Sequence, residues 1–380
     1  MGKVKLESIC TIVSGSTPKS SCPGYWGGSI KWVTPAEISD ETHYIEDTER
    51  HITEEGMRSC HLRMMPSGTV LLSSRAPIGK TAITKSAMCC NQGFKNLICG
   101  NSISNEYLYH FLKSKTDELK SIGRGATFKE ISKKQVESIT INLPALDEQN
   151  RRTAALGQID MLLKQNRKLI GIIDDLVKSR FVEMFGALEP SVSISDACIE
   201  FIDGDWIESK DQSESGIRLI QTGNIGNGDF RDKRNRARYI SEQTFEQLKC
   251  HEVHANDVLI SRLPDPVGRA CIVPSDADRS ITAVDCSIVR LKKEWEPLFF
   301  VSYTMTKQYE HQIQSYLTGT TRKRISRSNL GRIKIPAASF ALQQEFAAFV
   351  SQVDKLRFET QQQIEKLETL KRSLMQEYFG

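Results

Sequence analysis

Two glycine-containing stretches carry residue types that bind phosphate groups. GATFKEISKKQVESITI covers residues 125–141, and GTTRKRISRSNLGRIKI covers residues 319–335. Both begin Gly-x-Thr-x-Lys and lie among further basic residues. Lysine and arginine beside glycine and threonine can approach phosphates closely, through charge and through exposed backbone N–H groups. A lone cluster of this kind is usually a solvated charged face, but recurrence at equivalent positions favours phosphate-contacting loops that pivot on Gly125 and Gly319.

Candidate nucleic-acid contacts fall into two groups. The glycine loops supply candidates for phosphate contacts, and the loops that differ between the two copies supply side chains that could hydrogen-bond base edges. The first group is Arg124, Thr127, Lys129, Thr321, Arg322, Lys323 and Arg324. The second group is Lys19, Lys31, Arg75, Asn91, Gln92 and Lys95, with Gln221, Asn224, Arg262 and Arg269 further along; Lys80, at the position that corresponds to Arg269, completes the set. Asn and Gln in loops are more often turn residues, so the second group is less strongly supported by the sequence.

Catalytic interpretations of the sequence mostly fail. SRAPIGKT, residues 74–81, ends like a phosphate-binding loop, but Ser74 stands where the first glycine belongs. TGNIGNG, residues 222–228, lacks the strand and helix that a dinucleotide site needs. No Ser/His/Asp or Cys/His grouping recurs in both copies, and no metal-nuclease set follows Asp265. Cys250-His251 with His254, and Cys60-His61, lack a second ligand pair at zinc-finger spacing, so we expect no metal.

Composition describes an ordinary soluble protein of two or three domains. The chain has 380 residues, of which 39% are hydrophobic and 26% charged, and a net charge of +4 that does not by itself predict nucleic acid. No apolar run reaches membrane-spanning length and no signal-peptide pattern is present, so we expect a cytoplasmic protein. The ten cysteines form no CxxC pair and indicate reduced thiols.

The elements that would position these residues are present twice. Residues 156–186 and 350–380 align without a gap at a displacement of 194 residues, from Gly186 to Gly380. Both read as helices of some 38 residues, roughly 57 Å long. A narrow apolar stripe on a long helix needs a partner, and the other copy is the obvious one. The predicted seam is Ala155, Ile159, Leu162, Leu169, Ile173 and Leu176 against Phe346, Phe349, Val353, Leu356, Leu367, Leu370 and Leu374, with polar interruptions at Asn166, Thr360 and Gln363.

The segments before the helices also repeat. TVLLS at residues 69–73 corresponds to DVLIS at 257–261, and the two glycine loops again lie 194 residues apart. The loops between these similar segments differ in sequence. Strand and turn signals mix with a helix expected near 105–121, which predicts an α+β fold. We predict four parts: a recognition domain at 1–142, a spacer helix at 143–188, a second recognition domain at 189–335 and a second spacer helix at 336–380. A shared scaffold with unlike loops suits two different sites along DNA.

This paired arrangement resembles the specificity subunits of type I restriction-modification systems. ITINLPALDEQ with Gln158-Ile159-Asp160 in the first copy, and RIKIPAASFALQQ with Gln352-Val353-Asp354 in the second, carry the resemblance along with TVLLS/DVLIS and the Gly-x-Thr loops. The second copy has two more residues between Pro336 and Gln343 than the first has between Pro144 and Gln149, so its helix start is expected to be looser.

The resemblance implies a non-catalytic subunit that recognises double-stranded DNA. Two target-recognition domains would read the halves of a bipartite, asymmetric target, and the long helices would pack antiparallel as a coiled-coil-like spacer. Two methyltransferase subunits would bind the chain and bring S-adenosylmethionine. Two motor-nuclease subunits that use ATP and Mg²⁺ could join them, so that this chain itself holds no cofactor. Met161, Phe181 and Met184 are candidates for docking partners, although packing against the adjoining domain is an equal alternative.

Two other classes of function remain as alternatives. The first is a self-contained modifying enzyme, but the sequence has neither an NPPY methyltransferase motif nor a nuclease acid-x-Lys set. The second is a coiled-coil adaptor that binds proteins without sequence-specific DNA binding. The steep loss of affinity with salt that phosphate contacts produce would separate this adaptor from a DNA-binding protein.

Overall fold

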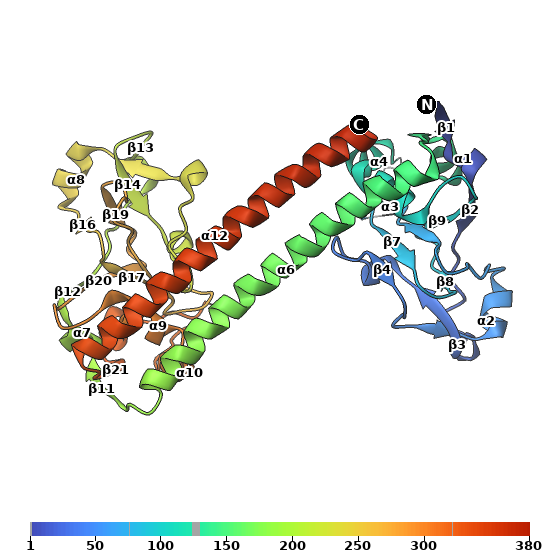
Figure 1. The fold of residues 1–380 in the computed structure, drawn as a ribbon. Helices are drawn as coiled ribbons and strands as arrows, with labels where there is room; N and C mark the ends of the chain where they lie inside the picture. Colours follow the sequence, from blue (N-terminus) through green and yellow to red (C-terminus); the bar gives the residue numbers. More distant parts are fainter. Residues whose placement is uncertain (1, 76, 124–129, 321) are drawn as a thin grey trace. The chain divides into compact units, whose positions relative to one another are not determined.

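The computed structural model describes residues 2–75, 77–123, 130–320 and 322–380. The chain divides into two compact units: unit 1 is Met1–Arg167 with Gln362–Gly380, and unit 2 is Lys168–Gln361. Each unit combines β-sheets and short helices with part of each of two long helices (Figure 1). The predicted α+β class is therefore confirmed.

Unit 1 contains a five-stranded sheet of order β2-β9-β6-β7-β4, a three-stranded sheet of order β5-β3-β8 and the pair β1-β10. The helix expected near 105–121 is present, but it is interrupted at Lys115 and forms α3 and α4. The strands are β1 Lys3–Lys5, β2 Cys10–Ser14, β3 Trp26–Val33, β4 Tyr44–Ile45, β5 His51–Ile52, β6 Val70–Leu72, β7 Thr81–Thr84, β8 Cys89–Cys90, β9 Lys95–Cys99 and β10 Thr140–Asn142. The short helices are α1 Leu6–Ile9, η1 Pro23–Tyr25, η2 Pro35–Glu37, α2 Glu54–Ser59, α3 Asn105–Ser114, α4 Thr116–Ile122 and α5 Lys133–Ser138.

Unit 2 contains a four-stranded sheet of order β12-β20-β17-β18, a five-stranded sheet of order β13-β15-β14-β19-β16 and the pair β11-β21. The strands are β11 Pro190–Ser193, β12 Cys198–Asp203, β13 Gln212–Ser213, β14 Ile217–Ile220, β15 Arg238–Ile240, β16 Glu252–Val253, β17 Val258–Ser261, β18 Ala270–Ile272, β19 Ser280–Thr282, β20 Cys286–Leu291 and β21 Lys334–Pro336. The short helices are α7 Ile194–Ala197, η3 Ser209–Asp211, η4 Thr222–Asn224, η5 Arg234–Arg236, α8 Glu242–Leu248, α9 Pro297–Thr304, α10 Lys307–Ser315 and α11 Arg327–Gly331.

The duplicated motif TVLLS/DVLIS forms the same structure in both units. It supplies β6 in unit 1 and β17 in unit 2, and each strand leads into a turn closed at a glycine. The Gly79 N–H donates to the Ser73 carbonyl at 3.0 Å, and the Gly268 N–H donates to the Ser261 carbonyl at 2.8 Å. Both glycines have positive φ angles, +93° and +85°, which explains why glycine stands at both positions.

The long helices α6, Leu146–Phe185, and α12, Phe340–Phe379, have 40 residues each. In unit 1 the start of α6 packs beside the end of α12. Arg152 donates to the Tyr378 carbonyl at 3.4 Å, and Asp160 pairs with Lys371. Residue numbers therefore rise along one helix as they fall along the other, which is the predicted antiparallel arrangement.

Unit 2 shows the same arrangement with the roles of the helices exchanged. The end of α6 packs beside the start of α12: Asp174 pairs with Arg357 at 2.6 Å, and Arg180 pairs with Glu345 at 3.0 Å. The side chains buried along the two helices are mainly apolar, as a helix-pair seam requires. They include Leu156, Ile159, Leu163, Ile173, Val177, Phe181 and Phe185 on α6, and Phe346, Val350, Val353, Thr360, Ile364 and Phe379 on α12.

The predicted seam is correct in part and wrong at four leucines. Leu162 and Leu176 of α6, and Leu356 and Leu370 of α12, are 42 to 48% exposed. The reason is that each helix must also cover a domain core, so its buried stripe turns toward the core residues of the adjoining sheets. Of the predicted polar interruptions, Thr360 is buried, and its hydroxyl donates a hydrogen bond to the Leu356 carbonyl at 2.8 Å. Gln363 is exposed.

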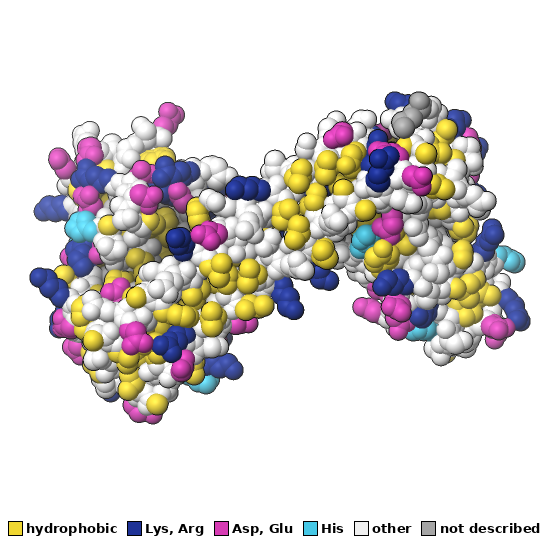
Figure 2. All heavy atoms as spheres, viewed as in Figure 1, with side chains coloured by type: hydrophobic (Ala, Val, Ile, Leu, Met, Phe, Trp, Pro, Cys, Tyr) yellow, Lys and Arg dark blue, Asp and Glu magenta, His cyan; other side chains and the backbone are white. Residues whose placement is uncertain are grey.

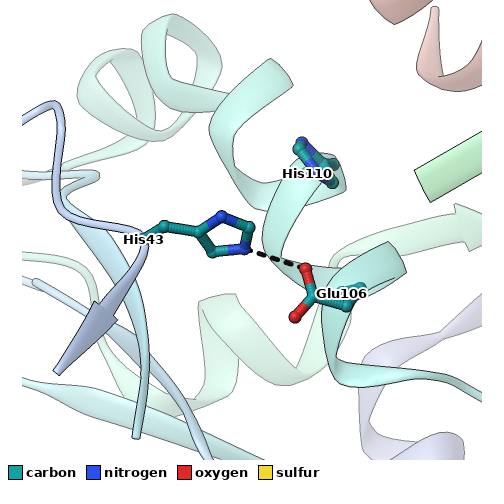
Figure 3. A group of neighbouring side chains, drawn as sticks. All are labelled: His43, Glu106 and His110. Atoms are coloured by element: carbon teal, nitrogen blue, oxygen red, sulfur yellow. Dashed lines mark hydrogen bonds and ion pairs between the residues drawn. The ribbon is translucent and has the colours of Figure 1, made fainter. Parts of the chain in front are cut away.

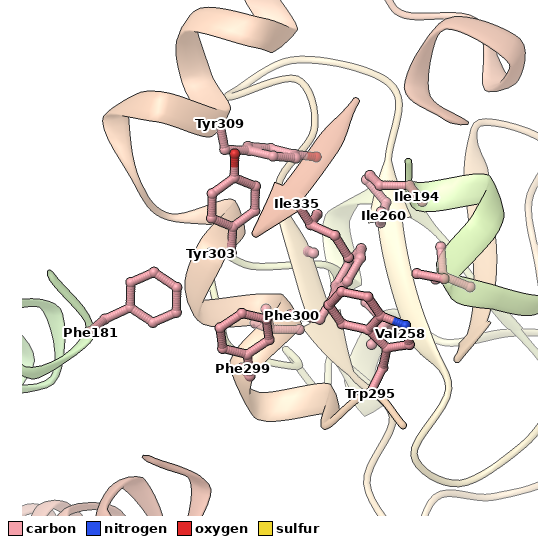
Figure 4. Close-up of a cluster of buried hydrophobic side chains, with 14 of the residues drawn as sticks. Phe181, Ile194, Val258, Ile260, Trp295, Phe299, Phe300, Tyr303, Tyr309 and Ile335 are labelled. Carbon is pink, nitrogen blue, oxygen red and sulfur yellow. The ribbon is translucent and has the colours of Figure 1, made fainter. Parts of the chain in front are cut away.

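Two of the predicted docking residues lie instead in the core of unit 2. Phe181 is only 4% exposed, and its ring lies 5.6 Å from that of Phe299 in an aromatic cluster with residues of α9 and α10 (Figure 4). Met184 packs against the same cluster. Met161 is 54% exposed and remains available.

A buried glutamine fastens the start of each long helix. Gln149 accepts a hydrogen bond from the Ser104 N–H at 2.9 Å and donates to the Ser102 and Pro144 carbonyls, both at 2.9 Å. Gln343 makes the corresponding three bonds, to the Glu296 N–H and to the Glu294 and Ala338 carbonyls. The expectation of a looser second helix start is therefore wrong, because the two extra residues precede this anchor and leave its bonds intact.

Replacing Gln149 with leucine should lower the stability of unit 1. The substitution keeps the size of the side chain but leaves one buried N–H and two carbonyls without partners, which costs about 2–4 kcal/mol. The free energy of unfolding measured in urea tests this. Gln158→Leu, at an exposed position of the same helix, is the control and should change stability by about 0.5 kcal/mol or less. Equal losses in the free energy of unfolding from the two substitutions would contradict an anchoring role for Gln149.

Candidate nucleic-acid interface

The glycine loop of unit 2 projects basic side chains from a closed turn. Thr318 and Arg324 exchange two backbone hydrogen bonds of 2.9 Å. Gly319 between them has a φ of +93°, and a Cβ at this position would lie 2.5 Å from the Arg322 carbonyl oxygen. Glycine is therefore required by the backbone at the position where the sequence predicted a pivot. The side chains of Arg322, Lys323 and Arg324 are exposed and have no polar partner among the residues that the structure describes.

Both glycine loops end beside the same strand end of their domain. In unit 2 the Ile325 N–H donates to the Arg262 carbonyl at 3.3 Å, and in unit 1 the Ile131 N–H donates to the Ser74 carbonyl at 2.9 Å. Arg262 directly follows β17, and Ser74 lies two residues after the end of β6. Arg124, Thr127, Lys129, Thr321 and the pivot Gly125 lie outside the described residues.

Arg75 and Lys95 meet at one carboxylate. Glu130, the first described residue after the glycine loop of unit 1, pairs with Arg75 at 2.9 Å and with Lys95 at 3.3 Å. Burial would raise the pKa of Glu130, but hydrogen bonds from the two cations outweigh burial and hold the pKa below its usual value. Arg75 is about half exposed, whereas Lys95 is buried, so Arg75 is the more accessible of the two.

The remaining candidates of unit 1 differ in whether their polar groups already make hydrogen bonds within the protein. Lys31 and Lys80 donate to backbone carbonyls at 2.6 and 3.3 Å, and the Asn91 Oδ1 accepts a backbone N–H at 2.6 Å. These contacts stabilise loops. Lys19 and Gln92 are exposed, and Gln92 accepts a hydrogen bond from a neighbouring threonine hydroxyl.

In unit 2, one largely buried hydrogen-bond network links three of the candidates: Gln221, Asn224 and Arg269. Arg269 is 7% exposed and donates to four backbone carbonyls at 2.7 to 2.9 Å, two of them in the segment that carries Asn224. Asn224 is 8% exposed and closes a turn by accepting the Gln221 N–H at 2.9 Å. These contacts give Arg269 and Asn224 structural roles and leave them few donors for a base edge.

Arg262 lies next to the glycine loop of unit 2. Its guanidinium donates to the Val284 carbonyl at 2.6 Å and lies 3.3 Å from an Asp203 carboxylate oxygen. Because its own carbonyl accepts the Ile325 N–H, Arg262 and the exposed Arg322–Arg324 segment belong to one surface of unit 2.

Two of the five basic side chains in the run at 231–238 are paired with acidic residues. Arg231 pairs with Asp229, and Arg234 pairs with Asp232 and Asp278. Figure 2 accordingly shows basic and acidic side chains interspersed around α8, β13 and β14. The three basic side chains of the glycine loop, Arg322, Lys323 and Arg324, have no such pairing among the described residues.

Sequence reasoning missed a polar cluster in unit 1. His43 Nε2 lies 2.8 Å from a carboxylate oxygen of Glu106, and His110 lies one helical turn further along α3 (Figure 3). The Tyr44 hydroxyl donates to the other Glu106 oxygen at 2.6 Å. The one signal in the sequence was the spacing of Glu106 and His110, which puts both on one face of a helix.

Burial sets the charge of this cluster. Burial lowers the pKa of His110 to about 4, so its ring is neutral at neutral pH. Burial would raise the pKa of Glu106, but hydrogen bonds from His43 and Tyr44 outweigh it and hold the pKa below its usual value. The carboxylate is therefore ionised beside a neutral, buried imidazole.

The fold and this surface define a class of protein with two related α+β domains on a shared helix pair, each with a glycine loop beside a corresponding strand end. The family model for the type I restriction modification DNA specificity domain matches residues 1–171 and 192–369. The chain belongs to this family. The two matched segments cover the two recognition domains with parts of the long helices.

Two curated relatives each match a little under half of the chain. The MjaIX type I restriction enzyme specificity subunit of Methanocaldococcus jannaschii is 38% identical over 189 residues, which are 49% of this chain and 44% of that protein. The EcoR124I/EcoR124II specificity subunit of Escherichia coli is 26% identical over 171 residues, which are 42% of each chain. These matches thus span less than half the length of either relative.

Solved structures show the same fold over the whole chain. The S subunit of a type I restriction-modification system from M. genitalium is 14% identical, with a TM-score of 0.58, and the match covers 100% of this chain and 96% of that one. A chain from a study of complex assembly and conformational transition in the type I R-M system is 18% identical, with a TM-score of 0.60, and covers 100% and 97%. At these identities the likeness concerns the fold.

Proposed function

We propose that this chain is the DNA sequence-specificity subunit of a type I restriction-modification complex. Each recognition domain reads one half of a bipartite, asymmetric target, and the helix pair sets the unspecified gap between the halves. The observation that carries this proposal is the duplicated scaffold: the same strand end occurs in both units and the Gly-x-Thr-x-Lys motif recurs in the sequence of both, while the loops around them differ. Equivalent loops can contact equivalent phosphates, and unlike loops can read unlike bases.

The partners follow from the same proposal. Two methyltransferase subunits dock on the chain, and two motor-nuclease subunits join the complex. The catalytic sites lie on these partners, which bring S-adenosylmethionine, ATP and Mg²⁺. None of the helices in the described part of the chain is long and apolar enough to cross a membrane. A cytoplasmic location, where the DNA lies, completes the proposal.

Reconstitution tests the proposal directly. The purified chain is mixed with a methyltransferase subunit and S-adenosylmethionine, and methylated positions are mapped on genomic DNA. We expect methylation at one split sequence with both components present, and none with the chain alone. Methyl transfer by the isolated chain, or methylation whose sequence does not depend on the chain, would refute it. A protein-only adaptor would not shift duplex DNA in electrophoresis, whereas a DNA-binding chain would do so with an affinity that falls steeply as salt rises.

Removing the charge of Lys323 should weaken binding to all DNA sequences alike. Each phosphate contact contributes about 0.9 to the slope of log affinity against log salt, so Lys323→Ala should reduce that slope by about 1. Electrophoretic shifts at several salt concentrations measure it. The exposed Lys366 of α12 supplies the control, because Lys366→Ala should leave the slope unchanged.

Lys129→Ala in the first domain should behave like Lys323→Ala. In contrast, Arg75→Ala and Arg262→Ala should change which sequences are preferred, each in one half of the target. A uniform loss of affinity from Arg262→Ala, with altered preference from Lys323→Ala, would reverse these assignments.

A further inference from the structure

The cluster of His43, Glu106 and His110 brings together three side chains that can bind a metal ion. Glu106 and His110 come from adjacent turns of α3, and His43 comes from the segment that precedes β4. One ligand atom from each residue lies within 4.8 Å of the other two. Figure 3 shows the His43 ring pointing at Glu106, with His110 beside them on α3, the helix that carries Glu106.

The position of the His43 ring is fixed by stacking. The rings of Tyr44 and Tyr109 lie 4.3 Å from it and nearly parallel to it. The Tyr44 hydroxyl also holds the second oxygen of Glu106 at 2.6 Å. A carboxylate with one oxygen held by an outer hydroxyl presents its other oxygen in a set direction, as the ligands of metal sites commonly do.

The His110 ring gives an independent reason to expect a ligand. It is 1% exposed, and neither of its nitrogens has a hydrogen-bond partner among the described residues. A buried polar group without a partner costs about 1–3 kcal/mol, so such groups call for an explanation. The charged groups that face the ring from the long helices are Asp160 and Lys371, and these pair with each other.

We propose that His43, Glu106 and His110 form a binding site for one Zn²⁺ ion. Two imidazoles and one carboxylate are a ligand set that zinc commonly takes in proteins, with bonds of about 2.0–2.2 Å and a fourth position left to water. The ion replaces the proton between His43 and Glu106 and takes up the free nitrogen of His110. This site departs from the absence of metal expected from the sequence.

The ion has a structural role in unit 1. It ties the segment before β4 to α3, and α3 packs against β6 and β7 of the recognition sheet. A ligand that binds only the folded state stabilises it in proportion to the logarithm of its concentration above Kd. Zinc therefore raises the thermal stability of unit 1, and this proposal is independent of which DNA sequence the chain reads.

The test uses the full chain, freed of metal with a chelator and titrated with Zn²⁺. Isothermal calorimetry and thermal unfolding should show one zinc ion per chain and a rise in Tm. Co²⁺ in place of Zn²⁺ should give the intense visible absorption of a four-coordinate site. His43→Gln and Glu106→Gln, at partly exposed positions, should each weaken zinc binding by more than the roughly 10–100-fold that loss of an outer partner costs.

Two controls separate this site from adventitious binding. His251 and Asp205 of unit 2 form a similar His–carboxylate pair at 2.9 Å, and they belong to no three-residue group among the described residues. His251→Gln should leave zinc binding unchanged. Zinc held by cysteine thiols would survive both ligand substitutions and disappear on alkylation of the thiols. Either that pattern, or no zinc-induced rise in Tm in the unmodified chain, would overturn the proposal.

Discussion

Replacing both Leu162 and Leu370 with glutamate is expected to remove one of the two methyltransferase subunits that we propose for the complex. These leucines belong to unit 1, where the Asp160–Lys371 pair sets them at about the same level of the two helices. They are 42% and 48% exposed, which leaves an apolar surface open for a partner. Hydrophobic side chains also gather along both long helices in Figure 2.

The duplication explains why one subunit of two should be lost. Leu356 and Leu176 occupy the equivalent positions in unit 2, at the level of the Asp174–Arg357 pair, and are 46% and 48% exposed. Each unit thus presents one leucine from each helix. Two equivalent surfaces predict two equivalent docking sites, so Leu176→Glu with Leu356→Glu should remove the other subunit.

The effect should be large. Burying a leucine contributes about 1.5–3 kcal/mol, and glutamate adds the cost of desolvating a charge, so a double substitution should weaken docking by at least roughly 100-fold. Native mass spectrometry of the assembled complex counts the subunits. Leu248→Glu on α8, where the leucine is 41% exposed, is the matched control and should leave two subunits bound. Retention of both subunits by the double variants would place docking elsewhere.

The sequence predicted the architecture because duplication supplied an internal comparison. The 194-residue displacement identified both long helices and the glycine at position 319, and the likeness of TVLLS to DVLIS identified the corresponding strands β6 and β17, without any knowledge of contacts. Gly319 was predictable because its positive φ leaves little alternative to glycine.

The face that each helix buries could not be predicted in the same way. The stripes of α6 and α12 carry more apolar residues than a two-helix seam needs, and the cores of the domains decide which of these are covered. Leu163 is buried while its neighbour Leu162 is exposed, a choice that depends on tertiary packing. The prediction that the four exposed leucines lie in the seam was wrong. Their exposure is informative, because an apolar residue that is buried in neither the seam nor a domain core is free to contact a partner.

The roles of individual polar residues were the least predictable. Arg269 and Lys323 are both basic residues near loop glycines, yet the first is bonded to four carbonyls in the interior and the second is exposed. His43 and Glu106 lie 63 positions apart and meet only through the fold. No local pattern distinguishes such cases, since burial depends on residues distant in sequence.

Exchanging residues 1–142 for the corresponding segment of another family member should change one half of the DNA target and leave the other half and the gap intact. The strand pairs make such an exchange feasible. β1 pairs with β10, so the two ends of the exchanged segment pair with each other, and β11 pairs with β21 in the same way in the second domain. Each domain can thus be replaced together with its terminal strand pair, except that Pro336, the last residue of β21, stays with the recipient.

One packing requirement limits the choice of donor. Tyr107 and Phe111 of the first domain lie 5.0 and 6.2 Å from the Phe379 ring of α12, so the donor must supply apolar side chains at both positions. Each mismatched base pair costs about 1–3 kcal/mol, so a change of several base pairs alters preference by orders of magnitude and is readily seen in methylation mapping. The reciprocal exchange of residues 189–335 is the matched control and should change only the other half. If either exchange altered both halves, recognition would depend on the two domains jointly, and the assignment of one half-target to each would fail.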